Sequence, residues 1–232
     1  MTVPSLKTFK GMKRDQICHY LKDQGYEVIR RGDLSSVFHQ AGSSRVVRVS
    51  MAPLTASFLC DFYKANEGNP YFPKVYYHKT INDTTHLSVM EKLVSLEELA
   101  EEEDNYVRLG YARALASFAF GDDIHKDFHR ELANSKEFVD TIHTLVNGVR
   151  QSLRDLGPQG ECLFLDRNPD GVLFRQNKDK SYQPVLANIL TYTSPSEALE
   201  LECDSILTRI RALEVEAREK RKAPTQGGAQ PQ

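Results

Sequence analysis

The fold of this chain is decided by two neighbouring stretches, Leu165-Asp166-Arg167-Asn168-Pro169-Asp170-Gly171-Val172-Leu173-Phe174-Arg175 and Pro184-Val185-Leu186-Ala187-Asn188-Ile189. In the first stretch, the sequence Asn-Pro-Asp-Gly is typical of a tight turn. The apolar runs on either side of it, residues 162–165 and 172–175, predict two short strands, and residues 183–190 form a further run. Asp166 and Gly171 therefore lie at the two ends of one loop, and Asn188 lies in the segment that follows.

Protein kinases use two loops of this kind. An Asp in the first loop lies beside the substrate hydroxyl, an Asn further along it holds one Mg²⁺, and the Asp of a second loop holds the metals. At these positions the chain has Asp166, Gly171 and Asn188. The base keeps its carboxylate, one metal ligand has lost its side chain, and another has become a neutral amide. The pattern indicates a phosphotransferase-like chain with an impaired metal site.

The segment before these loops is rich in short β-type runs. They span residues 26–29, 36–39, 44–49, 74–77 and 86–90, and turn signals at 41–44 and 82–83 suit hairpins. Between the third and fourth runs, residues 53–66 have helical spacing and are followed by glycine and proline. The pattern predicts a small lobe of five antiparallel strands and one helix, joined to the rest of the chain near residues 91–94.

The pattern then changes to helix. Ser95 and Glu98 can form a capping box, and apolar residues at helical spacing predict further helices at 106–120, 138–156 and 197–222. This order of elements predicts an α+β fold with two lobes. We expect a β-rich small lobe and N-terminal region at residues 1–92, a helical lobe that carries the two loops at 93–222, and a disordered tail at 223–232.

The order and spacing of these features resemble the early serine/threonine protein kinases of lytic podoviruses. The resemblance covers about residues 25–222 and includes Phe72-Pro73-Lys74-Val75-Tyr76 at the entry to the fourth strand. In the first loop, Asn168 replaces the His of that family and Gly171 its Asn; in the second, Asn188 replaces its Asp. The resemblance implies a bilobal protein-kinase-like fold in a degenerate form. It also implies a role early in infection, in the cytoplasm of a bacterial host, with host proteins as partners and ATP and weakly held Mg²⁺ as ligands.

The resemblance further places a nucleotide site at Gly32, Arg48 and Met90. The Gly-rich loop of the family corresponds to residues 30–35, where Gly32 remains and the first Gly is Arg30. A plain hairpin turn explains the same residues. Arg48 stands where a kinase has the lysine that grips the phosphates; arginine keeps the charge but presents a bulkier planar fork. A surface ion pair is the alternative role for Arg48.

Two loop aspartates also have alternative roles. Asp166 fits a catalytic base that accepts the proton of a substrate hydroxyl, but a loop Asp can equally cap backbone amides. Asp170 could supply a replacement carboxylate for the metal, or it could belong to the turn alone.

The remaining composition points to no other chemistry. Lys and Arg (30) nearly balance Asp and Glu (32), so we expect no direct nucleic-acid binding and no membrane binding. The cysteines lack a CxxC pair, which predicts free thiols in a reducing cytoplasm. His125 and His129 lack the Glu of a metalloprotease motif, so the histidines predict no alternative metal centre.

Three hypotheses follow. The first is a pseudokinase that acts by binding a host protein, and the second is an active serine/threonine kinase that uses Asp166. The third is an α+β scaffold unrelated to kinases. Phosphoryl transfer depends on positioning and on charge neutralisation by Mg²⁺, so the altered ligands favour the first. The candidate surfaces for a partner are Arg30–Arg31, the acidic run 97–104 and the charged helix 209–222.

Overall fold

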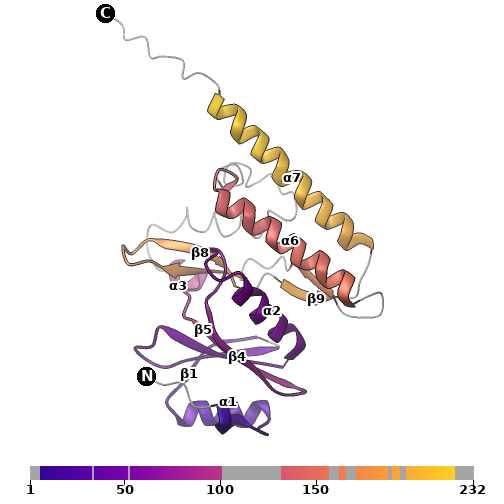
Figure 1. Ribbon diagram of the computed structural model, residues 1–232. Coiled ribbons are helices and arrows are strands. Elements are labelled where there is room, and N and C mark those ends of the chain that lie inside the picture. Colours follow the sequence, from indigo (N-terminus) through magenta and orange to yellow (C-terminus); the bar gives the residue numbers. More distant parts are fainter. Residues whose placement is uncertain are drawn as a thin grey trace, which may run out of the picture.

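The computed structural model has an α+β architecture, with an antiparallel sheet at one end and two long helices at the other (Figure 1). It describes residues 6–32, 34–51, 53–100, 132–156, 162–165, 171–187, 190–193 and 197–222. Within these ranges no helix is both long and apolar enough to cross a membrane. The predicted helix at 106–120 and the predicted disorder of 223–232 lie outside the described residues.

The sheet has five strands, as predicted. They are β1 (Glu27–Arg31), β2 (Ser35–His39), β3 (Arg45–Ser50), β4 (Val75–Asn82) and β5 (Thr85–Glu91), in the order β1-β2-β3-β5-β4 and all antiparallel. Gly42, with a φ of 74°, provides the left-handed residue in the β2–β3 turn. Both predicted hairpins are present, and β1 and β4 form the edges of the sheet.

One face of the sheet packs on an N-terminal helix that the sequence did not predict. Helix α1 (Arg14–Asp23) and a short 3-10 helix η1 (Leu6–Phe9) cover Val47 and Val49 of β3 and Leu87 and Val89 of β5. Helix α1 precedes the segment from which one helix was predicted, so it adds to the predicted small lobe from the N-terminal region. Only Ile17 and Leu21 of α1 are fully buried, and Lys13, a poor cap, precedes the helix, so its local signal is weak.

The opposite face packs on helix α2 (Pro53–Ala65), within the predicted range 53–66. Side chains alternate along a strand, so Val46 and Met90 face α2 while their neighbours face α1. Both faces of β5 are covered, which explains why all seven of its residues are buried. On the α2 side, however, β5 carries the polar His86 and Ser88.

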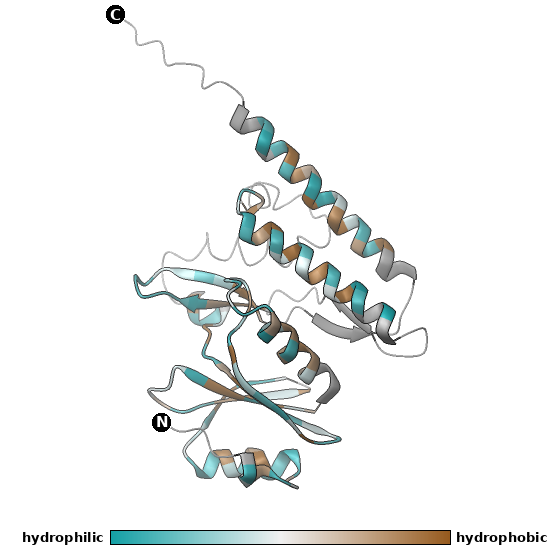
Figure 2. Cartoon of the chain, viewed as in Figure 1, coloured by the Kyte–Doolittle hydropathy of each residue, from teal (hydrophilic) through white to brown (hydrophobic). Residues whose placement is uncertain are grey.

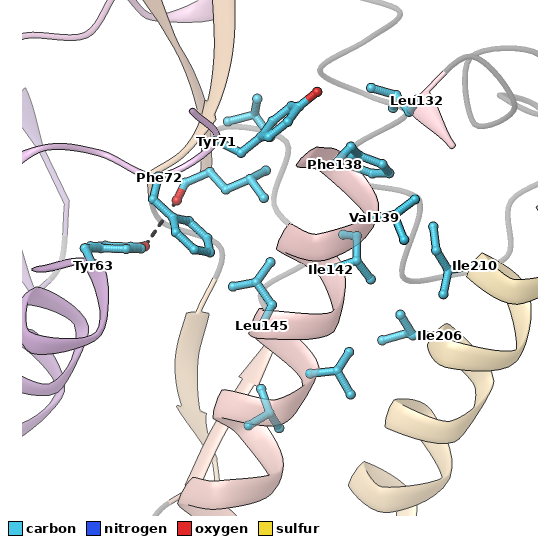
Figure 3. Close-up of a cluster of buried hydrophobic side chains, with 14 of the residues drawn as sticks. Tyr63, Tyr71, Phe72, Leu132, Phe138, Val139, Ile142, Leu145, Ile206 and Ile210 are labelled. Atoms are coloured by element: carbon cyan, nitrogen blue, oxygen red, sulfur yellow. Dashed lines mark hydrogen bonds between the residues drawn. The ribbon is translucent and has the colours of Figure 1, made fainter. Parts of the chain in front are cut away.

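Two long helices form the other end of the molecule, α6 (Lys136–Leu156) and α7 (Glu197–Lys222), and both match the predicted segments closely. Apolar side chains of the two helices lie between them, with Val139 and Ile142 of α6 toward Ile206 and Ile210 of α7 (Figures 2 and 3). Phe138, Ile142, Ile206 and Ile210 belong to the same buried cluster as Leu59 of α2. The core is thus continuous from the sheet to α7.

Gly148 lets α6 approach α2 closely. A Cβ atom at this position would lie 2.8 Å from Cε2 of Phe62, well inside van der Waals contact. Phe62 is held in turn by the rings of Phe72 and Tyr63, at centroid distances of 5.3 and 5.9 Å. A side chain at position 148 would therefore push against a constrained ring.

Four short strands complete the structure and correct one prediction. β6 (Cys162–Leu165) pairs with β9 (Leu190–Thr193), whereas β7 (Val172–Gln176) pairs with β8 (Tyr182–Leu186). The run predicted at 183–190 is thus divided between two strands that belong to different sheets. The division occurs after Leu186, where the amide of Ala187 turns away to donate to the Gly171 carbonyl at 2.9 Å.

Candidate functional site

A cleft of about 490 Å³ lies between the sheet and the β7–β8 hairpin. This volume is in the range of small-molecule sites in proteins. The sheet, the segment that leaves it, helix α3 (Leu96–Ala100) and the hairpin all contribute to its lining, which includes Ile29, Arg30, Gly32, Val37, Val46, Arg48, Met90, Leu93, Glu97, Gly171, Leu173 and Ala187.

The cleft brings together residues that are distant in the sequence. Gly32, Arg48 and Met90 line it from the sheet, and Gly171 lines it from the hairpin. Ala187, which precedes Asn188, lines it as well. Asp166, Asp170 and Asn188 themselves lie outside the described residues, so their roles, and their convergence with Arg48, stay predictions.

The sheet side of the cleft is basic. Arg48 is half-buried on the central strand β3, opposite Val37 of β2 and Ser88 of β5. Burial lowers the pKa of its guanidinium, because a charged group is less well solvated in the interior, and the neighbouring Tyr63 oppositely raises it. Arginine remains protonated even so. Arg30 also lines the cleft, so the sheet side of the cleft offers positive charge to an anion.

Apolar side chains line the cleft from two sides. Val37, Val46 and Met90 come from three strands of the sheet, and Leu173 comes from β7. A site that combines aliphatic walls with cationic groups suits a ligand that has both a ring and an anionic group.

Gly32 stands in the β1–β2 turn, where its amide donates to the Ser35 carbonyl at 2.9 Å. Its φ is not in the left-handed region, and an added Cβ would meet nothing closer than the Ser35 carbonyl oxygen at 3.9 Å. The turn itself therefore does not require glycine. Because Gly32 has no side chain, the backbone at this position stays open to a ligand in the cleft. This is compatible with both predicted roles of Gly32, a nucleotide-binding loop and a plain hairpin turn.

The segment after β5 holds the hairpin in place. The amide of Val94 donates to the Phe174 carbonyl at 2.8 Å, and the Phe174 amide donates back at 2.9 Å. Helix α3 starts directly afterwards with the predicted capping box: the Ser95 amide donates to Glu98 at 2.7 Å, and the Glu98 amide donates to Ser95 Oγ at 3.2 Å. The segment near 91–94, predicted to be a linker, thus runs from the end of β5 to the start of α3.

A buried ion pair reinforces this connection. Nε and Nη2 of Arg175 donate to the two carboxylate oxygens of Glu91 at 2.9 and 2.6 Å, and the same guanidinium donates to the carbonyls of Pro70 and Phe72, both at 2.8 Å. The Lys74 amide donates to Glu91 as well, at 2.8 Å. The sequence analysis did not identify this pair.

Helix α2 also reaches the second loop. The Tyr63 hydroxyl donates to the carbonyls of Leu186 and Ala187, at 3.2 and 3.4 Å (Figure 3 shows the ring and a dashed bond). Burial raises the pKa of this hydroxyl, so it stays protonated and remains a donor. Tyr63 thus connects the surroundings of Arg48 to the residues just before Asn188.

Gly171 offers no ligand from a side chain, and its carbonyl already accepts the Ala187 amide at 2.9 Å. Gly171, at the first of the two altered metal positions, therefore brings no side-chain ligand to the cleft. An ion at this end of the cleft would need its ligands from elsewhere.

The sequence analysis missed a second cluster, on the α2 face of the sheet. One ligand atom each from Cys60, His78 and His86 lie within 4.8 Å of one another. The prediction that the histidines form no alternative centre considered only His125 and His129, which lie outside the described residues, and did not consider this cluster. The three residues come from α2, β4 and β5, so no spacing motif marks them. As expected, Cys60 and Cys203 are buried free thiols, and Cys18 is a half-buried one.

No family model matches the sequence, and neither does any curated protein. Among solved structures, the Cydia pomonella granulovirus kinase PK-1 is 14% identical with a TM-score of 0.35; the similarity covers 77% of this chain and 60% of that one. Rad53 1–466 in complex with AMP-PNP is 11% identical with a TM-score of 0.37, over 75% of this chain and 42% of that one. The chain therefore spans less than two thirds of either protein. These matches are a distant structural similarity to protein kinases, too low to carry an argument about activity.

Proposed function

We propose that this chain is a kinase-like protein that binds a nucleotide in the cleft and is impaired in phosphoryl transfer. The observation that carries the proposal is the cleft itself, which unites Gly32, Arg48 and Met90 with Gly171. Aliphatic walls suit the base of a nucleotide, and Arg48 suits its phosphates. ATP is the ligand proposed, with Mg²⁺ held weakly.

The impairment follows from the metal positions. Kinases hold Mg²⁺ through an Asn and an Asp, and phosphoryl transfer relies on that charge neutralisation. Gly171 has no side chain to bind an ion, and Asn188 is neutral in the sequence. Because hard cations prefer anionic oxygen ligands, both changes weaken the hold on Mg²⁺.

Calorimetry with ATP tests nucleotide binding. The unmodified chain should bind ATP with little dependence on Mg²⁺, and Arg48→Met should weaken binding at least tenfold. Arg45→Ala is the matched control, because Arg45 lies on the same strand but is exposed and stacks on Tyr76 with its Cζ 4.2 Å from the ring centre. Equal affinity of Arg48→Met and Arg45→Ala would contradict the proposed site.

The second candidate function is an active serine/threonine kinase, favoured by the retained Asp166. It predicts Mg²⁺-dependent transfer of the γ-phosphate to protein, abolished by Asp166→Ala. The pseudokinase proposal instead predicts no transfer by the unmodified chain. It also predicts that Gly171→Asn with Asn188→Asp increases metal-dependent nucleotide binding, because the two side-chain ligands are restored.

We also propose that the chain acts through a protein partner, and that this partner is a host protein if the chain is a phage protein of the family it resembles. Strand β1 supports a docking role, since it is an edge strand and all five of its residues are exposed. Val28 and Ile29 are 39% and 45% exposed beside Arg30 and Arg31. An exposed edge offers backbone groups to which another chain can add a strand.

A pull-down from a bacterial lysate separates this docking from the cleft. A specific partner should be retained by Arg48→Met and lost when Val28 is replaced by Lys, since a charged side chain blunts an edge. Loss of the partner with folded Arg48→Met, and its retention with Val28→Lys, would assign the interaction to the cleft instead.

A further inference from the structure

The residues Cys60, His78 and His86 are not among those that line the cleft. Cys60 is on the face of α2 that meets the sheet, and the two histidines are on adjacent strands, where His78 is opposite Ser88 and His86 opposite Thr80. Cys60 is 4% exposed and His86 is completely buried. Three side chains that can hold a metal ion thus meet between one helix and one hairpin.

The hydrogen bonds of the histidines leave one nitrogen of each directed to no partner. Nε2 of His78 lies 3.2 Å from Oδ1 of Asp61, and Nδ1 of His86 lies 3.1 Å from Oγ1 of Thr80. The other two nitrogens, Nδ1 of His78 and Nε2 of His86, are buried and have no hydrogen-bond partner in the part of the chain that the structure describes. Buried polar atoms without partners are unusual and call for an explanation.

The same hydrogen bonds prepare these nitrogens as metal ligands. When His78 Nε2–H donates to Asp61, and His86 Nδ1–H donates to Thr80, the buried nitrogens each carry a free lone pair. A histidine that ligates a metal commonly donates its other N–H to a carboxylate or another oxygen, which fixes the tautomer. Asp61 and Thr80 stand in this supporting position.

We propose that Cys60, His78 and His86 bind one thiophilic d¹⁰ cation, Zn²⁺ or Cu⁺. Thiolate and imidazole are the ligands that these ions prefer, whereas Mg²⁺ and Ca²⁺ prefer oxygen. Binding replaces the proton of the Cys60 thiol by a sulfur–metal bond, and that proton leaves to solvent. Ligand atoms of a tetrahedral zinc site lie roughly 3.5 Å apart, so a set within 4.8 Å needs only a small contraction.

Local charge discriminates between the two ions. Arg48 lies opposite Ser88 and on the same face of the sheet as His86, so its charge is near the cluster. With the Cys60 thiolate, Cu⁺ gives a neutral group and Zn²⁺ a positive one beside this arginine. A buried positive charge is unfavourable, so Cu⁺ fits better.

Metal binding would fasten α2 to the β4–β5 hairpin. Cys60 is three residues before Tyr63, whose hydroxyl contacts the Leu186 and Ala187 carbonyls. The ion would therefore stabilise the helix that connects the sheet to the second loop. This role does not depend on whether the cleft binds a nucleotide.

The test uses the full chain, stripped with a chelator and kept reduced. After dialysis against Zn²⁺, and against Cu⁺ buffered by a competing chelator, elemental analysis should give one equivalent per chain. Co²⁺ should produce the absorption of a thiolate-to-metal charge transfer, which requires the sulfur as a ligand. Absence of both the stoichiometric ion and the thiolate band in the unmodified protein would overturn the proposal.

Variants assign the ligands. Cys60→Ala and His86→Gln should weaken binding at least tenfold. Cys203→Ala and His39→Gln should not, because they alter another buried thiol and a half-buried histidine that bonds to the Ser43 carbonyl. Equal affinity of Cys60→Ala and the unmodified chain would overturn the assignment. The unmodified chain should bind Cu⁺ more tightly than Zn²⁺, and Arg48→Met should reduce the difference between the two affinities. This result would support the charge argument.

Discussion

Removal of Arg175 should destabilise the fold more than any surface substitution. The Arg175 side chain is 17% exposed and that of Glu91 only 8%, and the guanidinium makes two bonds to the carboxylate and two to carbonyls. Arg175→Met leaves the Glu91 carboxylate buried, with the Lys74 amide as its remaining donor among the described residues. Breaking a buried pair by removing one partner costs about 3–5 kcal/mol.

Urea unfolding measures this effect. With a slope of about 2–3 kcal/mol per molar, the midpoint of Arg175→Met should fall by roughly 1–2.5 M. Arg154→Met is the control, because Arg154 is exposed on α6 and donates to Gln151 at 3.1 Å. Its effect should stay within about 0.5 kcal/mol.

The double variant Glu91→Met with Arg175→Met separates the cost of an unpaired charge from the value of the pair. Replacing both members of a buried pair by apolar residues is often nearly neutral. The double variant should therefore regain more than half of the lost stability. A loss below about 1 kcal/mol in Arg175→Met, or a double variant no more stable than this single one, would refute the reasoning.

Three further substitutions test the packing around the cleft. Gly148→Leu should lower the free energy of unfolding by about 1–3 kcal/mol, measured by thermal unfolding, because even a Cβ would lie 2.8 Å from Phe62. Phe62→Leu in the same chain should recover part of this stability. No recovery would place the strain elsewhere. Tyr63→Phe should cost about 1 kcal/mol through loss of the bonds to the carbonyls before Asn188, and an unchanged urea midpoint would show that they contribute nothing. Ser95→Ala should cost about 1 kcal/mol and speed hydrogen exchange in α3 alone, and unchanged exchange there would contradict the capping box.

Most secondary structure could be predicted because its signals are local. The five strands are short runs of β-type residues, α2, α6 and α7 have apolar residues at helical spacing, and Ser95 with Glu98 forms the predicted capping box. Helix α1 was missed because two buried residues, Ile17 and Leu21, are too few to establish a period. The run at 183–190 gave no sign that one strand ends within it and another begins, because the residues before and after that point are equally apolar.

The site was predictable only in part, for a different reason. Gly32 and Gly171 were predicted from the resemblance to kinase loops and Arg48 from the position of the third-strand lysine; all three line one cleft, and their roles stay predictions. Arg175 and Glu91 lie 84 positions apart, and no local pattern marks two such charges as partners. The Cys60, His78 and His86 cluster is likewise set by packing between a helix and a hairpin.

A crystal structure of the chain with a non-hydrolysable ATP analogue tests the central claim most directly. The account predicts the base between Val46 and Leu173 and the phosphates beside Arg48 and Gly32, with no ordered metal held by residue 171. An analogue bound outside this cleft, or a cleft that stays free of nucleotide at saturating concentration, would contradict it.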